Sequence, residues 1–163
     1  MGIEKDIQQF NFVSVQQKAM INLLFTYGWI IEKIRDFLAE EDITHQQFNI
    51  LRILRGSHPK PLSTLQIRER MLDKMSDTSR IVDRLVAKGF VKKTTCSKDK
   101  RLVDVTITDK GQKLLKKLDG EADHIAEIMG SLSDREAEQL SELLDKLRCH
   151  ESRNRATPQP LKQ

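Results

Sequence analysis

The sequence predicts a mainly α-helical protein that carries one small β-hairpin. Apolar residues recur at spacings of three and four along most of the 163 residues. A strand-like alternation replaces that period only between about residues 90 and 107. A hydrophobic content of 38% with only 5% aromatic residues indicates a core of Leu, Ile and Val, and 32% charged residues suits a chain of solvated helices.

The first predicted helix covers about residues 14–40, where apolar residues recur at helical spacing. The pattern breaks at residues 42–43. Thr44, followed three residues later by Gln47, matches a capping box and predicts a second helix. That helix should end in the segment 56–61, which contains one glycine and two prolines.

Two short helices are predicted next. Ser63 or Thr64 can cap the first of them. Ser76 can cap the second, which spans residues 77–88 and stops at Gly89 in the C′ position. Three helices in quick succession, two of them joined by a short turn, form a helix-turn-helix arrangement.

A strand pair follows directly. Residues 90–95 are β-prone, and residues 102–107 alternate apolar and polar side chains. The polar, mostly basic segment 96–101 lies between them as the tip of a hairpin. Such a hairpin after a helix-turn-helix is a wing, so the fold class is a winged helix-turn-helix.

Helical periodicity returns after the hairpin. Thr108 begins a predicted helix that runs to Met129 and breaks at Gly130. Ser133 and Glu136 have the spacing of another capping box, which opens the last helix.

The predicted organisation has four parts. An N-terminal segment with a dimerisation helix covers residues 1–42, and the winged helix-turn-helix domain covers residues 43–111. C-terminal dimerisation helices cover residues 112–150. The tail, residues 151–163, has no apolar face and is expected to be disordered.

The last helix carries an apolar stripe that is too broad to leave exposed on a monomer. We therefore expect a homodimer, and a twofold dimer would place two DNA-reading helices about one DNA turn apart, as a palindromic site requires. The predicted interface residues are Leu140, Leu143, Leu144 and Leu147.

Charge is concentrated in the middle of the chain. Residues 52–113 hold 16 Lys and Arg against 7 Asp and Glu, a balance of +9, whereas the rest of the chain holds 12 against 17, a balance of −5. This distribution is typical of a module that binds a polyanion, and beside a winged helix it indicates double-stranded DNA. The alternative is a winged helix used only for protein contacts, which would not need the local positive charge.

A helix-turn-helix places the N-terminal side chains of its second helix against base edges and phosphates. Arg80 is favoured, because its forked donors suit guanine edges and phosphate oxygens. A plain N-cap role explains Ser76 equally well, and a structural ion pair explains Arg84 equally well. The predicted DNA-contacting residues of this helix are Ser76, Thr78, Ser79, Arg80 and Arg84.

The hairpin tip supplies the second group of predicted DNA contacts. An arginine on a thin hairpin can enter the minor groove, where the negative potential is deepest. A carboxylate beside it can hold the shape of the tip. The residues concerned are Lys98, Asp99, Lys100 and Arg101.

Three sequence segments resemble the recognition helix, wing and following helix of MarR-type transcriptional regulators: Asp77–Val91, Asp99–Arg101 and Ile107–Gly111. The resemblance extends over roughly residues 43–118. Leu72–Asp73 stands where the family often has a glycine turn, which predicts a longer connection between the two short helices.

The resemblance implies a homodimer on palindromic operator DNA, with the terminal helices as its interface. It also implies base or phosphate contacts by Ser79 and Arg80, and minor-groove insertion of Arg101 supported by Asp99. Many members of the family are repressors that leave DNA on binding a small aromatic compound. The expected function is therefore a sequence-specific repressor released by such a ligand.

Two kinds of signal are candidates for releasing the expected repressor from DNA. Phe25, Tyr27 and Trp29 on the first long helix are candidate lining residues for an aromatic ligand, although core or dimer packing explains them as well. The alternative is redox control through Cys96, whose pKa the neighbouring Lys93 and Lys98 would lower, against the simpler interpretation of an inert strand cysteine.

Other functions are disfavoured. The four histidines are dispersed without a second metal ligand, and no nucleotide-binding or nucleophile motif appears, so we expect no catalytic site, no metal and no cofactor. No apolar run approaches the length of a membrane span. Two distant cysteines argue against a disulfide framework and predict a cytoplasmic protein.

Overall fold

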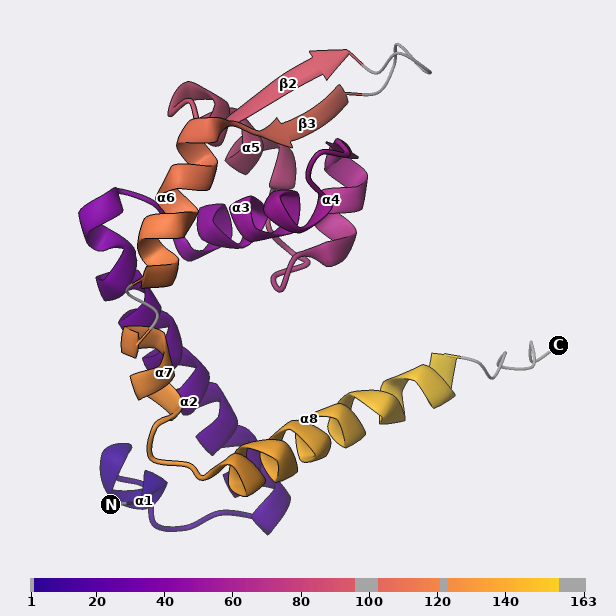
Figure 1. The fold of residues 1–163 in the computed structure, drawn as a ribbon. Helices are drawn as coiled ribbons and strands as arrows, with labels where there is room; N and C mark the ends of the chain where they lie inside the picture. The colour runs from indigo at the N-terminus through magenta and orange to yellow at the C-terminus, as the bar shows by residue number, and fades with distance from the viewer. Residues whose placement is uncertain (1, 96–102, 121–122, 156–163) are drawn as a thin grey trace, which may run out of the picture. The chain divides into compact units, whose positions relative to one another are not determined.

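The structure is a computed structural model that describes residues 2–95, 103–120 and 123–155 (Figure 1). It is mostly helical, with one small three-stranded antiparallel sheet, which confirms the predicted fold class. The chain forms two compact units, Met1–Ala122 and Asp123–Gln163. The winged helix-turn-helix lies wholly in the first unit.

The first unit contains ten helices and strands among its described residues. They are α1 (Ile3–Asp6), α2 (Val15–Leu38), the 3₁₀ helix η1 (Ala39–Glu41), α3 (His45–Ser57), β1 (Leu62–Ser63), α4 (Thr64–Arg70), α5 (Thr78–Ala87), β2 (Val91–Thr95), β3 (Val103–Ile107) and α6 (Asp109–Gly120). The second unit contains α7 (Asp123–Met129) and α8 (Asp134–Arg155). None of the helices in these ranges is long and apolar enough to cross a membrane.

Local capping starts two helices of the first unit where the sequence predicts them. Thr44 accepts a hydrogen bond from the Gln47 backbone N–H, and the Gln47 side chain accepts from the Thr44 backbone N–H, which completes the capping box of α3. Ser63 and Gln66 form the same reciprocal pair at the start of α4. Each box satisfies two backbone donors that have no partner inside the helix.

The start of α5 differs from the prediction that Ser76 is its N-cap. Asp77 is the N-cap instead, because its carboxylate accepts the Arg80 backbone N–H at 3.1 Å. The Ser76 hydroxyl donates to Asp73 at 2.5 Å and is therefore engaged in the preceding turn. The predicted end of the helix is confirmed, since Gly89 follows it with a φ of +74°, a left-handed conformation that glycine adopts readily.

The sheet has the order β1-β3-β2. In the predicted hairpin, β2 pairs antiparallel with β3, and Val91 lies opposite Ile107. The strand β1, which pairs Leu62 with Val105, has no counterpart in the sequence prediction. A strand of two residues has no readable alternation, and its partner lies more than 40 positions further along the chain, so only the folded chain defines it.

The core of this unit lies between the helix-turn-helix and the sheet. Packing of α3 against α5, α6 and β3 orients α5 (Figure 1). On α5 the buried side chains include Val82 and Leu85, each with 0% exposure. Full burial of such a side chain stabilises the fold by about 1.5–3 kcal/mol, so the face of α5 that turns outward is well determined.

Gly111, which follows β3, occupies a position with no room for a side chain. It lies in the first turn of α6, where a Cβ atom would be 2.4 Å from the Phe90 carbonyl oxygen and 2.8 Å from Cγ1 of Ile107. Its backbone N–H donates to the Thr108 hydroxyl at 3.2 Å, which caps the helix. The close approach of α6 to the end of α5 therefore requires a residue without a side chain.

The second unit modifies two predictions. The helix expected from Thr108 to Met129 is described as α6 and α7, on either side of residues 121–122, which lie outside the described residues. The tail expected from residue 151 onward is described only for residues 151–155, which continue α8. Residues 156–163 lie outside the described residues.

The predicted capping box of α8 is confirmed. The Ser133 backbone N–H donates to the Glu136 carboxylate at 2.9 Å, and the Glu136 backbone N–H donates to the Ser133 hydroxyl at 3.4 Å.

Candidate nucleic-acid interface

The outward face of α5 presents donor side chains to solvent. Ser79, Arg80 and Arg84 are all exposed. Within the described part of the chain, neither arginine forms an ion pair, so both guanidinium groups are available to an external acceptor. A guanidinium with free donors on an exposed helix face fits base edges and phosphate oxygens.

Two of the residues predicted to contact DNA have other roles. Thr78 is only 5% exposed, and its hydroxyl donates to the Met71 sulfur at 3.3 Å. Thr78 therefore presents little surface to DNA, because its side chain packs against Met71 at the end of α4. Ser76 is half-buried and bonded to Asp73, so its hydroxyl is already engaged.

The connection between α4 and α5 covers residues 71–77, longer than a three- to four-residue helix-turn-helix turn. Its backbone is tied down at two points. The Leu72 N–H donates to the Asn49 side chain of α3 at 3.0 Å, and the Met75 N–H donates to the Asp73 carboxylate at 3.0 Å. These two bonds fix the course of the longer connection.

Asp73 organises this connection through both carboxylate oxygens. The Ser76 hydroxyl, and after it the Met75 backbone N–H, hold the pKa of the Asp73 carboxyl below its ordinary value of 3.8. Because the folded state lowers this pKa, the stabilisation is present above pH 3.8 and is lost as the pH falls through the lowered value.

We expect Ser76→Ala to raise the pKa of Asp73 towards its ordinary value, because the substitution removes the strongest hydrogen bond to the ionised carboxylate. The measurement is an NMR titration of the Asp73 side-chain carbon in the full chain. Ser79→Ala is the matched control, since Ser79 has no bond to Asp73 in the structure and its loss should leave the titration unchanged. An unchanged Asp73 pKa in Ser76→Ala would contradict this geometry.

The wing strand is linked to α5 by charge. Lys93 on β2 forms an ion pair with Asp83, which is exposed on α5. The structural ion pair considered for Arg84 is thus supplied by Lys93 and Asp83. A surface ion pair of this kind contributes about 0–1 kcal/mol, so its main effect is to orient the strand relative to the helix.

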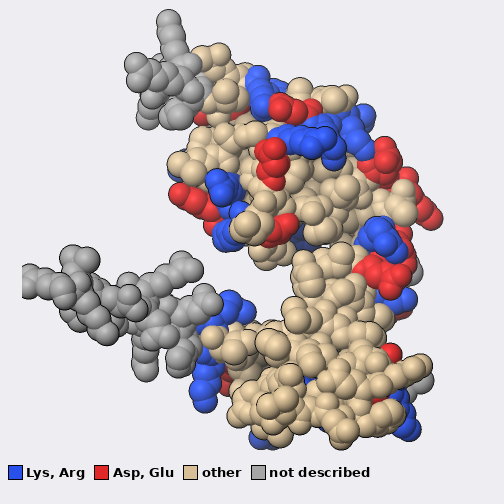
Figure 2. Space-filling view, turned by 180° about the vertical axis from the view of Figure 1, so that it is seen from behind, with Lys and Arg blue, Asp and Glu red and all other residues tan. Residues whose placement is uncertain are grey.

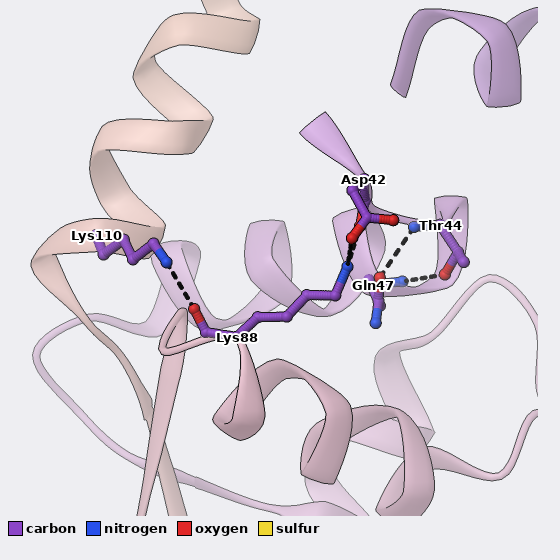
Figure 3. A network of polar contacts seen from close by, with 5 residues as sticks. All are labelled: Asp42, Thr44, Gln47, Lys88 and Lys110. Atoms are coloured by element: carbon purple, nitrogen blue, oxygen red, sulfur yellow. Dashed lines mark hydrogen bonds and ion pairs between the residues drawn. The ribbon is translucent and has the colours of Figure 1, made fainter. Parts of the chain in front are cut away.

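The C-terminal end of α5 is held by a network of polar contacts (Figure 3). The Lys88 ammonium lies 2.7 Å from the Asp42 carboxylate and also donates to the Asp42 carbonyl. Lys110 of α6 donates to the Lys88 carbonyl at 2.8 Å. The network ties α5 to the corner between η1 and α3 on one side and to α6 on the other.

The charge of this region is mixed but positive. Figure 2 shows Lys and Arg side chains gathered over the winged-helix part of the first unit, with Asp and Glu among them. The segment 52–113 carries a balance of +9 in the sequence. A positive surface around an exposed donor-rich helix is suited to a nucleic-acid backbone.

Comparison with known proteins identifies the family. The model of the MarR family matches residues 43–103. The HTH-type transcriptional regulator YkoM of Bacillus subtilis (strain 168) is 33% identical over 149 residues, which cover 88% of this chain and 96% of YkoM. The chain belongs to the MarR family.

Solved structures agree with this assignment. A MarR transcription factor from Planctomyces limnophilus is 34% identical to this MarR-family chain, with a TM-score of 0.65, over 83% of this chain and 98% of that one. A mutant of MarR from E. coli, solved in complex with operator DNA, shares the fold with a TM-score of 0.69 at 22% identity, over 90% and 99% of the two chains. The relatives are transcription regulators rather than enzymes.

This MarR-family protein is therefore a DNA-binding transcriptional regulator. The family assignment favours DNA over the alternative of a winged helix used only for protein contacts. No cluster of three or more potential metal ligands occurs among the residues that the structure describes.

Several predicted site residues fall in the wing tip, which lies outside the described residues. They are Lys98, Asp99, Lys100 and Arg101, together with Cys96. Neither the structure nor the comparisons support redox control through Cys96.

The candidate ligand and dimer residues are exposed. Phe25, Tyr27 and Trp29 on α2 retain 41–57% of their accessible surface, so they do not form a core within their own chain. On α8, Leu143 and Leu147 are each 63% exposed and Leu140 is 38% exposed, whereas Leu144 is half-buried.

Proposed function

We propose that the protein regulates transcription as a homodimer that binds a palindromic operator, with α5 in the major groove. The observation that carries this proposal is the contrast between the two faces of α5. Val82 and Leu85 anchor one face in the core, while Arg80 and Arg84 on the other have no ion-pair partner among the described residues. A rigid helix with free guanidinium groups suits readout of base edges.

The DNA contacts proposed for α5 involve Ser79, Arg80 and Arg84, without Thr78. The wing tip supplies the minor-groove contact, with Arg101 inserted and Asp99 supporting it. DNA binding by this fold is supported by the mutant of E. coli MarR that was solved with operator DNA.

Homodimerisation is proposed from the surface of the terminal helices. Residues 22–29 of α2 are exposed over eight successive positions, which means that no side of this stretch is buried in its own chain. The leucine stripe of α8 is exposed as well. Apolar surface of this extent is normally covered by a partner, and a second copy of the chain would cover both the exposed stretch of α2 and the leucine stripe of α8.

The regulatory part of the proposal is a repressor that a small aromatic compound releases from DNA. Phe25, Tyr27 and Trp29 lie in the stretch of α2 proposed to meet the second copy, so the aromatic ligand is proposed to stack on these rings at that interface. Repression and ligand release follow the general behaviour of the family.

We expect Arg80→Ala to weaken operator binding by about 1–3 kcal/mol, or roughly 5- to 150-fold, if Arg80 contacts a base. The measurement is fluorescence anisotropy on duplexes from the intergenic region upstream of the coding sequence, with a random duplex for comparison. Arg52→Ala is the control, since Arg52 is an exposed arginine of α3 that stacks on Phe48.

The outcome on random DNA separates two roles for Arg80. An equal loss on operator and random duplexes would show a phosphate contact rather than a base contact. Full retention of operator binding by Arg80→Ala would contradict the placement of α5 in the major groove.

A further inference from the structure

Three large apolar side chains around the helix-turn-helix remain in solvent. Leu65 of α4 is 63% exposed, and Leu72 and Met75 of the connection are 89% and 92% exposed. The nearby Met71, at 1% exposure, shows that the connection can bury an apolar residue. The exposure of Leu72 and Met75 therefore follows from the course of the connection, whereas Leu65 is exposed on the surface of α4.

Met75 is held in its exposed position by the turn. Its backbone N–H is bonded to Asp73, and the next residue, Ser76, is bonded to the same carboxylate. The backbone on both sides of the Met75 side chain is thus restrained while the side chain itself is exposed. A restrained backbone reduces the entropy lost when such a side chain makes an intermolecular contact.

Leu65 and Met75 line the same groove, whereas Leu72 does not. The groove lies between α4 and the start of α5, and its wall also includes Thr64, Arg68, Ser76, Asp77, Thr78 and Ser79. Hydroxyl groups, a guanidinium and two apolar side chains therefore meet in one place, beside the Asp77 carboxylate, which accepts the Arg80 backbone N–H. This mixture suits a nucleotide, which presents a phosphate, a sugar and the edge of a base, better than it suits a purely apolar ligand.

The groove is continuous with the DNA-reading surface. Ser79 belongs to both, and Arg80 follows it on the exposed face of α5. If α5 enters the major groove, the groove residues face the neighbouring base pair on the same side of the duplex. The apolar group that DNA presents in the major groove is the C5-methyl of thymine.

We propose that Leu65 and Met75 form a specificity site that recognises the methyl group of a thymine next to the bases contacted by α5. Methionine suits this role, because its flexible thioether side chain adapts to a small apolar group. The inference rests on the proposed function, since it requires α5 to lie in the major groove of the operator.

The test compares thymine with deoxyuridine, which lacks only the methyl group. Operator duplexes identified by selective binding of the full chain carry deoxyuridine at one thymine at a time, and affinity is measured by fluorescence anisotropy. For the wild-type protein we expect one position in each half-site at which deoxyuridine weakens binding about fourfold, the ratio that burial of one methyl-sized group produces.

Substitutions of the groove residues test whether the groove causes this preference for thymine over deoxyuridine. Met75→Ala should bind the thymine operator about fourfold more weakly and should no longer distinguish thymine from deoxyuridine. Any effect of the methyl group on the shape of the DNA is the same for both proteins and cancels in this comparison. Leu65→Ala should reduce the discrimination as well. Leu72→Ala is the matched control, because Leu72 is also highly exposed but lies outside the groove, and it should keep the wild-type discrimination.

Two results would overturn the proposal. One is a wild-type protein that binds all deoxyuridine operators as tightly as the thymine operator. The other is a Met75→Ala protein that keeps the full preference for thymine. A failure of the proposed function is distinguishable from both, because the unmodified operator would then bind no better than random DNA.

Discussion

Leu143→Asp is expected to separate the proposed dimer into monomers and to weaken operator binding by on the order of 100-fold or more, because a monomer loses the added affinity of two linked half-sites. Leu143 is the better position for this test than its neighbour Leu144. It is 63% exposed in the single chain, whereas Leu144 is half-buried. An aspartate at position 143 therefore places a charge in the proposed interface without disturbing contacts inside the chain.

The measurement is sedimentation velocity at several protein concentrations, followed by anisotropy on the operator. Ser141→Asp is the matched control, since Ser141 is exposed on the same helix but lies off the leucine stripe. It adds the same charge and should remain dimeric with unchanged affinity. A persistent Leu143→Asp dimer would place the interface elsewhere, and the exposed residues 22–29 of α2 would be the next region to test.

Gly111→Ala is expected to destabilise the folded protein by about 3 kcal/mol, at the upper end of what overpacking of a core costs. The added Cβ would meet the Phe90 carbonyl oxygen at 2.4 Å and Cγ1 of Ile107 at 2.8 Å. Phe90 contributes a backbone atom that also accepts the Thr108 N–H at 3.0 Å, so it cannot move aside without breaking the start of α6. A separation of α6 from the end of α5 is the expected response.

Denaturant unfolding at a single protein concentration measures this effect, because the stability of a dimer depends on concentration. Gly56→Ala is the matched control. Gly56 lies within α3, and no other atom lies within 4 Å of the point that a Cβ would occupy there, so alanine should stabilise the helix by up to about 1 kcal/mol. Equal free energies of unfolding for Gly111→Ala and the wild type would contradict the close contact at Phe90.

Features that depend on neighbouring residues can be predicted from the sequence. The capping boxes at Thr44 and Ser133 depend on residues three positions apart, and both are present in the structure. The stop at Gly89 depends on the conformational freedom of one residue. The exposed donors Ser79 and Arg80 are predictable for the same reason, since the helical period and the apolar face of α5 place them outward.

Features that depend on distant residues cannot be predicted in this way. The Asn49 side chain that accepts the Leu72 N–H lies 23 positions away, and Lys88 and Asp42 are separated by 46 positions. The position of Thr78 in the first turn of α5 predicts a DNA contact, but the packing of α4 turns its hydroxyl to Met71. The choice of N-cap between Ser76 and Asp77 is ambiguous in the sequence, because both side chains offer the same chemistry.

The sequence alone determined the fold class, the family resemblance and the position of α5, the helix proposed to read DNA, because helical period, capping and glycine conformation are encoded over a few consecutive residues. Only the tertiary structure decided which polar side chains of that helix remain free and which apolar side chains stay in solvent. Thr78 and Met75 are three positions apart, yet Thr78 is buried and Met75 is exposed. Thr78 is buried because it packs against Met71 at the end of α4, and Met75 is exposed because its backbone N–H is bonded to Asp73.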